Sequence, residues 1–256
     1  MNTADSIVNR QRQPHAVLDL PSRRLKGIKI ERLLHLADRP QPIRMLEIGT
    51  GSGGIAHYFA THPDLSIEVD AVDVVDNRLI DEAYRFQLVS DTVLPFADES
   101  FDVVLTNHVI EHVGDEKAQL RHLGEIRRVL RADGVGYLAV PNRWQFVEPH
   151  YRLALLSWWP RSWRSRYLSM FRNKKFYDCE PLSVKQAEHL LDQSGFAFEA
   201  LGVRALRLTL ELEYPRDSVL RRLLDRVPDA CIAALAPMIP TLIYRFTRMQ
   251  TAPPLQ

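Results

Sequence analysis

The stretch IRMLEIGTGSGGIAHYFATH, residues 43–62, decides the fold. It opens with an apolar run, Ile43–Ile48, of the kind that forms a buried parallel strand. Glycines follow at positions 49, 51, 53 and 54, and the segment Ile55–Ala60 then has the composition of a helix. A strand, a glycine-rich turn and a helix open a nucleotide-binding α/β sheet, because glycine permits a sharp turn and lets a ligand press against the main chain. The alternative is a tight structural turn without a ligand.

The spacing of the glycines fits two cofactor motifs. Gly49, Gly51 and Gly54 match G-x-G-x-x-G, the dinucleotide fingerprint. Glu47 and the glycines at 49, 51 and 53 resemble E-x-G-x-G-x-G, the first motif of class I S-adenosylmethionine (SAM) methyltransferases. Glu47 favours the second motif, because a carboxylate is repelled by a pyrophosphate but can accept charge-assisted hydrogen bonds from the methionine end of SAM.

The composition is that of a folded domain of ordinary size. The chain has 256 residues, of which 46% are hydrophobic and 25% charged, and its net charge is +1. Disorder is not indicated, and no overall field points to a dedicated nucleic-acid binder. The two cysteines, Cys179 and Cys231, lack CxxC or CxxH spacing, so we expect free or buried thiols and no metal site. Because the N-terminus has no apolar signal-peptide core, we expect a cytoplasmic protein.

Acidic residues follow the next two predicted strands. Ile67–Val72 is predicted to form a strand, and Asp73 closes it 22 positions after Gly51 (73 − 51 = 22). An acid at this place can accept hydrogen bonds from both ribose hydroxyls of an adenosine. A solvent-facing loop aspartate is the alternative interpretation. Phe86–Ser90 is the third predicted strand, and Asp91 follows it.

The segment that begins at Asp91 carries the most specific pattern. Asp91-x-x-Leu94-Pro95-Phe96, Glu99-Ser100-Phe101-Asp102-Val103-Val104 and Glu111-His112-Val113 occur in this order. With the glycine motif, they resemble the type 11 group of class I SAM methyltransferases, which includes quinone C-methylating enzymes and many O- and N-methylating enzymes of small molecules. The resemblance covers about residues 44–142 well and the remainder loosely. Its motifs are specific for the cofactor and say little about the acceptor.

The resemblance implies SAM as the cofactor and a set of contacts to it. Asp73 would hold the ribose, Asp91 the adenine amino group, and Thr92 would lie beside the adenine. Asn107, at the end of the fourth predicted strand, would line the methionine portion. The predicted cofactor-binding residues are Glu47, Gly49, Thr50, Gly51, Gly53, Asp73, Val74, Asp91, Thr92 and Asn107.

The resemblance also implies an α/β fold: a Rossmann-like, doubly wound sheet of seven strands in the order 3-2-1-4-5-7-6, with the last strand antiparallel and a small helical cap. Strands are predicted at 43–48, 67–72, 86–90, 101–106 and 135–140, within 196–210, and at 240–247. Helices are predicted at 22–37 with Ser22 as the cap, 55–60, 116–130 ended by Asp133-Gly134, 183–194 between Ser183 and Gly195, and 216–227. The methyltransferase domain is expected over 22–248, between a flexible N-terminal segment at 1–21 and a tail at 249–256. Cap or substrate inserts are expected at about 144–182 and 211–239.

Aromatic and basic residues alternate between Tyr151 and Tyr177. Arg161, Arg164 and Arg166 belong to this run, and no acid occurs between positions 161 and 175. One interpretation is an ordinary cap helix with buried aromatics and solvated cations. Another is a surface for an anionic or amphiphilic acceptor, contacted by Tyr151 and these three arginines, or for peripheral contact with a membrane. Nucleic acid is a third interpretation, which the nearly neutral total charge disfavours.

Methyl transfer from a sulfonium requires that the acceptor atom be held in line with the departing sulfur. A hydroxyl or amine acceptor also needs a base to remove its proton. His108 and His150 are the candidates, since both lie in predicted loops at the carboxyl edge of the sheet, whereas His112 also fits a structural role. A mechanism that relies on positioning alone, without a base, is the alternative.

We therefore predict SAM-dependent methyl transfer to a hydroxyl or amine of a small-molecule, lipid-linked or anionic acceptor. Three alternatives are kept: C-methylation of a quinone-like acceptor, an NAD-dependent oxidoreductase, and a protein that binds SAM without turnover. Calorimetric titration with SAM and NAD separates the methyltransferase from the oxidoreductase, and an assay of transfer products separates an enzyme from a binding protein.

Overall fold

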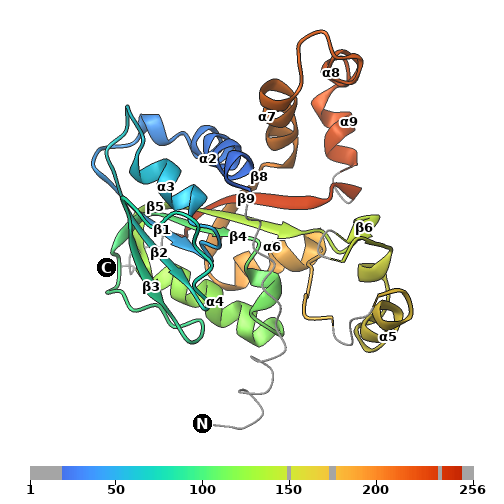
Figure 1. Cartoon of the computed structure of the whole chain (residues 1–256), viewed down its shortest axis with the longest axis horizontal. Coiled ribbons are helices and arrows are strands. Elements are labelled where there is room, and N and C mark those ends of the chain that lie inside the picture. The colour runs from blue at the N-terminus through green and yellow to red at the C-terminus, as the bar shows by residue number, and fades with distance from the viewer. Residues whose placement is uncertain (1–18, 149–150, 173–176, 236–237, 250–256) are drawn as a thin grey trace, which may run out of the picture.

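The computed structural model of the protein describes residues 19–148, 151–172, 177–235 and 238–249 (Figure 1). Its centre is a seven-stranded sheet in the spatial order β3-β2-β1-β4-β5-β9-β8. In chain order, these strands are β1 (Ile43–Ile48), β2 (Ile67–Asp73), β3 (Arg85–Leu88), β4 (Phe101–Asn107), β5 (Leu130–Pro141), β8 (Phe196–Ala200) and β9 (Thr241–Arg248). Neighbours among β1–β5 pair in parallel, and β9 pairs antiparallel with both β5 and β8. The predicted strand order and the antiparallel last strand are confirmed.

Helices cover both faces of the sheet (Figure 1). On one face lie α2 (Leu20–Leu34), α3 (Gly54–Ala60) and α7 (Gly202–Glu213), and on the other lie α4 (Glu116–Val129) and α6 (Val184–Gln193). The central strands are therefore buried on both sides, which explains why β1 and β4 are nearly continuous apolar runs. Successive residues of β1 divide between the two layers: Met45 belongs to the core under α2 and α3, and Leu46 to the core under α4 and α6.

The ends of α6 follow the sequence signals directly. Ser183 and Gln186 form a capping box: the Gln186 N–H donates to Ser183 Oγ, and the Ser183 N–H donates to Gln186 Oε1 at 3.1 Å. Gly195 follows the helix with a φ of +75°, a left-handed conformation that glycine adopts without strain. The predicted helix over 183–194 is confirmed to within one residue at each end.

The first helix starts earlier than predicted. α2 begins at Leu20 and carries Pro21 in its first turn, where the missing N–H has no helical partner to lose. Ser22 therefore lies inside the helix and is not its cap; its hydroxyl donates to the Asp19 carbonyl oxygen at 2.9 Å. A 3-10 turn, η1 (Leu36–Asp38), connects α2 to β1.

The junction of α4 and β5 also differs from the prediction. α4 ends at Val129 and β5 begins at Leu130, so the Asp133-Gly134 pair lies within the strand and does not end the helix. Leu130 pairs with Phe101 at the start of β4, and a shift in register separates this pair from the main ladder. The structure adds α7, for which the sequence analysis makes no prediction and which packs on α2 and β9.

Two groups of elements project from the sheet (Figure 1). The first, called the cap below, comprises the described residues between 143 and 182 and contains β6 (Val147–Glu148), β7 (Leu153–Ala154), η3 (Leu156–Trp158) and α5 (Arg161–Phe171). The second, called the arm, contains α8 (Val219–Asp225) and α9 (Asp229–Ala234). The cap has a small core of its own, formed by Tyr151, Leu156, Leu168, Tyr177 and Cys179.

The arm differs from the prediction in its packing. The expected helix at 216–227 is present as the shorter α8, but its apolar residues Val219, Leu220 and Leu223 are exposed and do not face a core. Within the described part of the chain, no helix has the length and apolar character needed to cross a membrane.

Candidate cofactor and acceptor site

The turn between β1 and α3 requires glycine. Gly49, Gly51 and Gly53 all have positive φ, at 75°, 55° and 78°. A Cβ atom on Gly49 would lie 2.4 Å from Val109 Cγ2, and one on Gly53 would lie 2.3 Å from the Ile80 carbonyl oxygen. The turn is thus in close contact with the loop after β4 on one side and the loop after β2 on the other, so no larger residue fits without moving them.

Glu47 lies at the base of this turn and is only 2% exposed. Its Oε2 accepts a 2.7 Å hydrogen bond from Thr50 Oγ1. Burial raises the pKa of Glu47 to about 8, and the charge of Asp73 adds to the rise, while hydrogen bonds from Thr50 and Ala56 and the charge of Arg23 oppose it. Glu47 is therefore mostly protonated at neutral pH in the cofactor-free protein, unlike the charged carboxylate assumed from the sequence. A cationic ligand beside it would favour the ionised form.

Asp73 ends β2 and braces the glycine turn from the neighbouring strand. Its Oδ2 accepts from the Gly51 N–H at 2.9 Å, and its Oδ1 accepts from the Val74 N–H at 2.7 Å. Oδ1 is also 3.5 Å from the Val75 N–H, whereas Oδ2 has one donor and can accept a further hydrogen bond from a ribose hydroxyl. The geometry is compatible with the predicted ribose contact, and Val74 itself is exposed at the same edge.

Asp91 and Thr92 lie beyond β3, in a loop attached to the same edge. The Val89 N–H donates to the Asp73 carbonyl oxygen at 2.9 Å, which places the chain two residues before Asp91 beside the end of β2. Asp91 Oδ1 accepts from the Val93 N–H at 2.7 Å, an Asx turn that shapes the loop. The two residues predicted to contact the adenine therefore lie in the loop after β3, the strand next to the predicted ribose contact at the end of β2.

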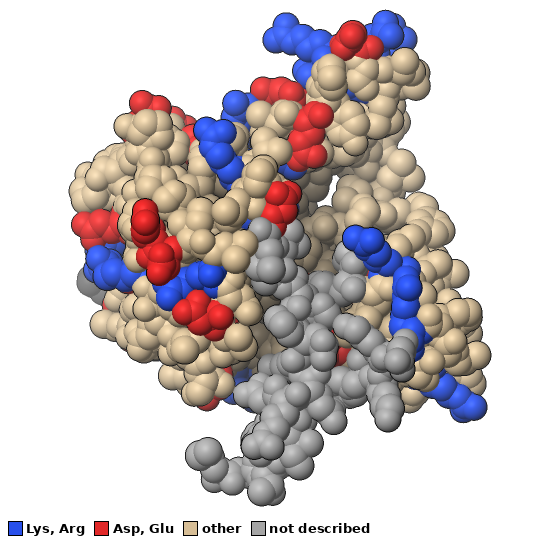
Figure 2. Space-filling model, in the orientation of Figure 1, with Lys and Arg blue, Asp and Glu red and all other residues tan. Residues whose placement is uncertain are grey.

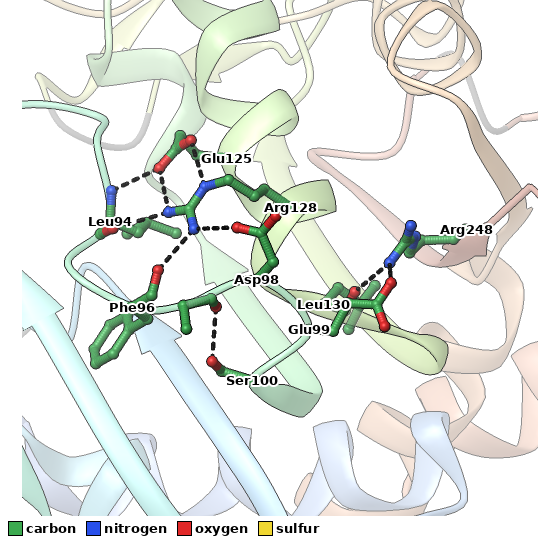
Figure 3. A network of polar contacts seen from close by, with 10 residues as sticks. Leu94, Phe96, Asp98, Glu99, Ser100, Glu125, Arg128, Leu130 and Arg248 are labelled. Carbon is green, nitrogen blue, oxygen red and sulfur yellow. Dashed lines mark hydrogen bonds and ion pairs between the residues drawn. The ribbon is translucent and has the colours of Figure 1, made fainter.

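Arg128 of α4 fixes the loop at residues 94–100, which follows Asp91 and Thr92 (Figure 3). Its guanidinium donates to the carbonyl oxygens of Leu94 and Phe96 and to the carboxylates of Asp98 and Glu125, at 2.7–2.9 Å. Glu125 also accepts from the Leu94 N–H at 2.8 Å. The Leu94-Pro95-Phe96 pattern is thus a loop of defined shape held from α4. Arg128 could not be predicted as its partner, because no local spacing in the sequence connects it to this loop.

Asn107 and His108 stand at the carboxyl end of β4. Thr106 lies opposite Ile48 in the parallel ladder, so Asn107 follows beside the start of the glycine turn. His108 has a φ of 59°, and its N–H donates to the Ala139 carbonyl oxygen at 2.8 Å. Residues other than glycine are uncommon in this conformation, and such strained positions cluster at functional sites.

Glu111, in η2 (Ile110–His112), is fully buried next to two histidines. His108 Nδ1 lies 3.3 Å and His112 Nε2 lies 4.0 Å from Glu111 Oε1. Burial alone would raise the pKa of Glu111, but the contact with His108 and the charges of both histidines outweigh it and lower the pKa below its ordinary value. Glu111 is therefore ionised at neutral pH. Glu111 belongs to the Glu111-His112-Val113 motif, but nothing in the local sequence assigns it a role.

Residues 46–138 match the model of a protein family described as a methyltransferase domain. This range contains the glycine turn, Asp73, Asp91 and the carboxyl end of β4, which together build the site described above. The chain carries a class I SAM-dependent methyltransferase domain. The match ends before the cap begins, so it covers the cofactor edge of the sheet and not the cap.

Curated proteins similar to this methyltransferase domain include an uncharacterized methyltransferase and an enzyme of ubiquinone biosynthesis. Over 98 residues the chain is 35% identical to an uncharacterized methyltransferase, YcgJ of Bacillus subtilis, an alignment that covers 36% of this chain and 38% of that protein. Over 141 residues it is 31% identical to ubiquinone biosynthesis O-methyltransferase of Parvibaculum lavamentivorans, covering 49% and 52%. The alignments thus span 38% and 52% of the length of these two curated relatives.

Solved methyltransferase structures share the fold. The crystal structure of YcgJ aligns with a TM-score of 0.52 at 17% identity and covers 88% of this chain and 99% of that one. Phosphoethanolamine N-methyltransferase 2 of Haemonchus contortus, in complex with SAM, aligns with a TM-score of 0.50 at 17% identity and covers 88% and 52%. At these identities the likeness concerns the fold, and it confirms the predicted Rossmann-like architecture.

SAM is the cofactor of such a domain, and the residues at the carboxyl edge fit it. Asn107 Oδ1 is buried without a hydrogen-bond partner among the described residues, so it is an acceptor placed where the methionine ammonium is expected. Asp73 keeps acceptor capacity for hydroxyl groups. The individual cofactor contacts stay predictions.

The structure separates the predicted acceptor residues of the cap. Tyr151 is buried, and its hydroxyl donates to Asp178 Oδ1 at 2.7 Å. Arg164 is only 3% exposed and donates to the Trp159 carbonyl oxygen at 2.9 Å and to Glu180 Oε2 at 3.3 Å. Both side chains are internal to the cap and are not presented on its surface, and their role as acceptor contacts stays a prediction.

The other predicted residues of this region have different positions. Arg161 and Arg166 are exposed: Arg161 Nε lies 2.7 Å from Glu180 Oε1, and the Arg166 guanidinium lies 6.0 Å from the centre of the Trp163 ring. Both remain accessible to an acceptor. His150, the second predicted base, lies outside the described residues, and its role stays a prediction.

Proposed function

We propose that this protein transfers the methyl group of SAM to a hydroxyl or amine of an amphiphilic acceptor, lipid-linked or anionic, with His108 as the general base. The observation that carries this proposal is the His108–Glu111 pair, in which an ionised and fully buried carboxylate lies 3.3 Å from Nδ1 of a partly exposed histidine. The pair follows directly on Asn107, the residue predicted to line the methionine end of SAM.

In the proposed mechanism, His108 takes the proton of the acceptor through Nε2. Glu111 faces Nδ1 and favours a proton on that nitrogen, so Nε2 is the atom able to accept one. The negative charge of Glu111 stabilises the imidazolium that results, and the proton passes from it to solvent. SAM bound at the carboxyl edge would supply an electrophilic methyl group whose leaving group is a neutral thioether.

The surface of the cap supports an acceptor with an apolar body and an anionic group. Its exposed apolar side chains are mostly aromatic: Trp144, Phe146, Trp158, Trp159, Trp163 and Phe171. Its exposed cations are Arg152, Arg161, Arg166 and Arg172. Among the described residues of 143–172, the single acid is Glu148, which is buried. Figure 2 shows basic side chains along the edge of the molecule where Figure 1 places α5, with few acidic side chains nearby.

Peripheral contact with a membrane is part of this proposal. Indole rings partition to the interface between headgroups and acyl chains, and arginines attract anionic headgroups. The exposed apolar side of α8 offers a second, smaller contact. A lipid-linked acceptor would then reach the carboxyl edge of the sheet without leaving the bilayer surface.

The names of the relatives support transfer to oxygen or nitrogen. One is named for O-methylation in ubiquinone biosynthesis, and another is a sarcosine/dimethylglycine N-methyltransferase of Aphanothece halophytica, 27% identical over 104 residues, which cover 37% of this chain and 36% of that protein. No structural observation favours C-methylation of a quinone-like acceptor. An NAD-dependent oxidoreductase is disfavoured by the match of residues 46–138 to the model of a methyltransferase domain.

The test is a transfer assay with methyl-labelled SAM and the full chain, run against fractions of lipids and of water-soluble small molecules. We expect label in a lipid-soluble product with the wild type and its loss in His108→Asn. Calorimetry should show SAM binding by both proteins. SAM binding without transfer to any fraction would instead identify a binding protein, and NAD binding without SAM binding would identify an oxidoreductase.

The membrane contact is tested separately by flotation on vesicles of phosphatidylglycerol and of phosphatidylcholine. We expect binding to the anionic vesicles, weakened by Trp163→Ser and unchanged by Leu88→Ser, which removes a similarly exposed apolar side chain from the far edge of the sheet. If Trp163→Ser and Leu88→Ser bind the anionic vesicles equally well, the cap is not the surface that contacts the membrane.

A further inference from the structure

A cluster of metal-ligand side chains joins the cap to the sheet. His112 ends η2, which follows β4, whereas Asp178 and Cys179 lie after the cap helix, 66 residues further along the chain (178 − 112 = 66). One ligand atom from each of the three side chains lies within 4.8 Å of the others. His112 Nδ1 is 3.7 Å from Cys179 Sγ, and Cys179 Sγ is 3.5 Å from Asp178 Oδ1. Sequence spacing predicted no metal site because these residues meet only in the folded chain.

We propose that His112, Asp178 and Cys179 bind a Zn²⁺ ion that fastens the cap to the methyltransferase core. In a tetrahedral zinc site, bonds of about 2.3 Å to sulfur and about 2.0–2.1 Å to nitrogen or oxygen place neighbouring ligand atoms about 3.5 Å apart. The His112–Cys179 and Cys179–Asp178 separations, 3.7 Å and 3.5 Å, are close to this value. A three-residue site leaves the fourth position to water or to a further group.

Two neighbouring side chains, Tyr151 and Glu111, support the ligands of the cluster. Tyr151 donates its hydroxyl to Asp178 Oδ1 at 2.7 Å. Glu111 Oε1 lies 4.0 Å from Nε2 of His112, so a carboxylate stands behind the imidazole on the side away from the cluster. Ligating histidines in proteins are commonly supported by a carboxylate in this manner, which fixes the ring and raises the basicity of the coordinating nitrogen.

The buried charge in this region is negative. Glu111 is fully buried, and neither of its oxygens receives a well-directed hydrogen bond from any described residue. Its carboxylate and those of Asp178 and Glu148 all act electrostatically on Cys179. A divalent cation at the cluster would lower the electrostatic cost of holding these carboxylates close together. His112 is partly exposed, which gives an ion access to the site.

The ligand types select zinc over the common alternatives. A thiolate and an imidazole suit Zn²⁺, whereas Mg²⁺ and Ca²⁺ prefer sites made of oxygen atoms. The competing structure is a network of hydrogen bonds without metal, in which the Cys179 thiol donates to Asp178. The two differ in whether the folded protein holds metal and in which cysteine contacts it.

The experiment measures Zn²⁺ and Co²⁺ binding to the full chain after dialysis against a chelator. We expect about one equivalent of Zn²⁺ per chain, and the Co²⁺ form should show the near-ultraviolet charge-transfer band of a thiolate ligand together with the visible bands of tetrahedral cobalt. Cys179→Ser should remove the thiolate band and weaken Zn²⁺ binding by about a hundredfold or more. Cys231→Ser is the matched control, because it removes the exposed cysteine of the arm, and it should leave both measurements unchanged.

Two further variants keep the test decisive if Cys179→Ser folds poorly. Asp178→Asn removes a charged ligand with little change of shape, and Tyr151→Phe removes only the hydroxyl that supports Asp178; we expect weaker Zn²⁺ binding in both, by about 10- to 100-fold for Tyr151→Phe. SAM binding by calorimetry reports whether each variant is folded. A folded wild type that binds no Zn²⁺ more tightly than folded Cys179→Ser overturns the proposal, as does a thiolate band that disappears in Cys231→Ser. None of these readouts depends on methyl transfer.

Discussion

The cofactor edge of the sheet and the cap are built from different kinds of contact. At the cofactor edge, main-chain geometry sets the shape: Gly49 and Gly53 have positive φ, and Asp73 accepts hydrogen bonds from main-chain N–H groups. In the cap, side chains set the shape, through a small apolar core and the Arg164–Glu180 contact. A substitution in the glycine turn of the cofactor edge therefore changes the main-chain conformation. In the cap, by contrast, surface residues can be replaced without loss of the fold. The family match, which ends at residue 138, covers the first region and not the second.

The largest effect is expected at the junction of the two regions. His108→Ala should lower turnover by about 10²- to 10⁴-fold, because proton removal from the acceptor loses its base. SAM affinity should stay at the wild-type value. The matched control is His189→Ala, which removes an exposed histidine of α6 and should leave turnover unchanged. Wild-type turnover in His108→Ala would indicate a base-free mechanism or a different base.

A glycine exchange tests whether the main chain shapes the cofactor edge. Gly53→Ala should destabilise the fold by about 3 kcal/mol, since it combines a strained φ with a clash against the Ile80 carbonyl. Gly124→Ala, on the surface of α4, has open space at its Cβ and should stabilise by about 0.5–1 kcal/mol. Denaturant unfolding measures both changes. Equal stability of the two variants would contradict the structural role of the turn.

The ribose contact is tested by Asp73→Ala. SAM affinity should fall by about 1.5–3 kcal/mol, the range for hydrogen bonds to a charged group, although part of this loss comes from the unsupported Gly51 N–H. Asp76→Ala removes an exposed carboxylate three residues away and serves as the control, with wild-type affinity expected. Calorimetry that gives wild-type affinity for Asp73→Ala removes this residue from the predicted contacts.

The protonation of Glu47 predicts a pH dependence of SAM binding. With a pKa of about 8 in the cofactor-free protein, Glu47 must lose a proton when the cationic cofactor favours its ionised form. SAM affinity should therefore rise with pH, by up to about tenfold per unit, and level off above pH 8. Glu47→Gln should give a flatter profile. A pH-independent affinity in the wild type would place the cofactor ammonium away from this side chain.

The same raised pKa predicts how stability depends on pH. Folding raises the pKa of Glu47 above its ordinary value of 4.5, so the folded state binds a proton that the unfolded state releases between pH 4.5 and about 8. The corresponding stability is present below this window and is lost as the pH rises through it. Urea unfolding should therefore show that Glu47→Gln loses less stability than the wild type between pH 5 and pH 8.

The smallest effect is expected on the surface of the cap. Arg166→Gln should weaken binding to phosphatidylglycerol vesicles by about 1 kcal/mol, or about fivefold, and the wild-type binding should weaken with salt. SAM affinity and stability should not change. Arg164→Gln sharpens the comparison, because this buried residue contacts Glu180, so its loss should lower the unfolding midpoint. If both variants lower stability equally, the distinction between cap surface and cap core is wrong.

The sequence predicted the cofactor edge in detail because its signals are local. β1 occupies the predicted residues 43–48, and Asp73 and Asn107 stand at the ends of their strands as expected. Apolar runs interrupted by glycine or acid mark strand ends directly, and parallel strands bring those ends to one edge. Helix boundaries were less well predicted: Ser22 and Asp133-Gly134 have the composition of helix ends, but packing placed the ends elsewhere.

By itself, the sequence determined the sheet, the strand order, the cofactor class and the set of acidic residues along the cofactor edge. Only the tertiary structure decided that His108 faces Glu111, that Arg164 is buried in the cap, and that His112 meets Cys179. These contacts join residues from separate elements, or depend on which side of a helix is covered, and no spacing in the chain encodes them. The protonation of Glu47 belongs to the same group, because a carboxyl becomes neutral only when the surrounding fold removes its water.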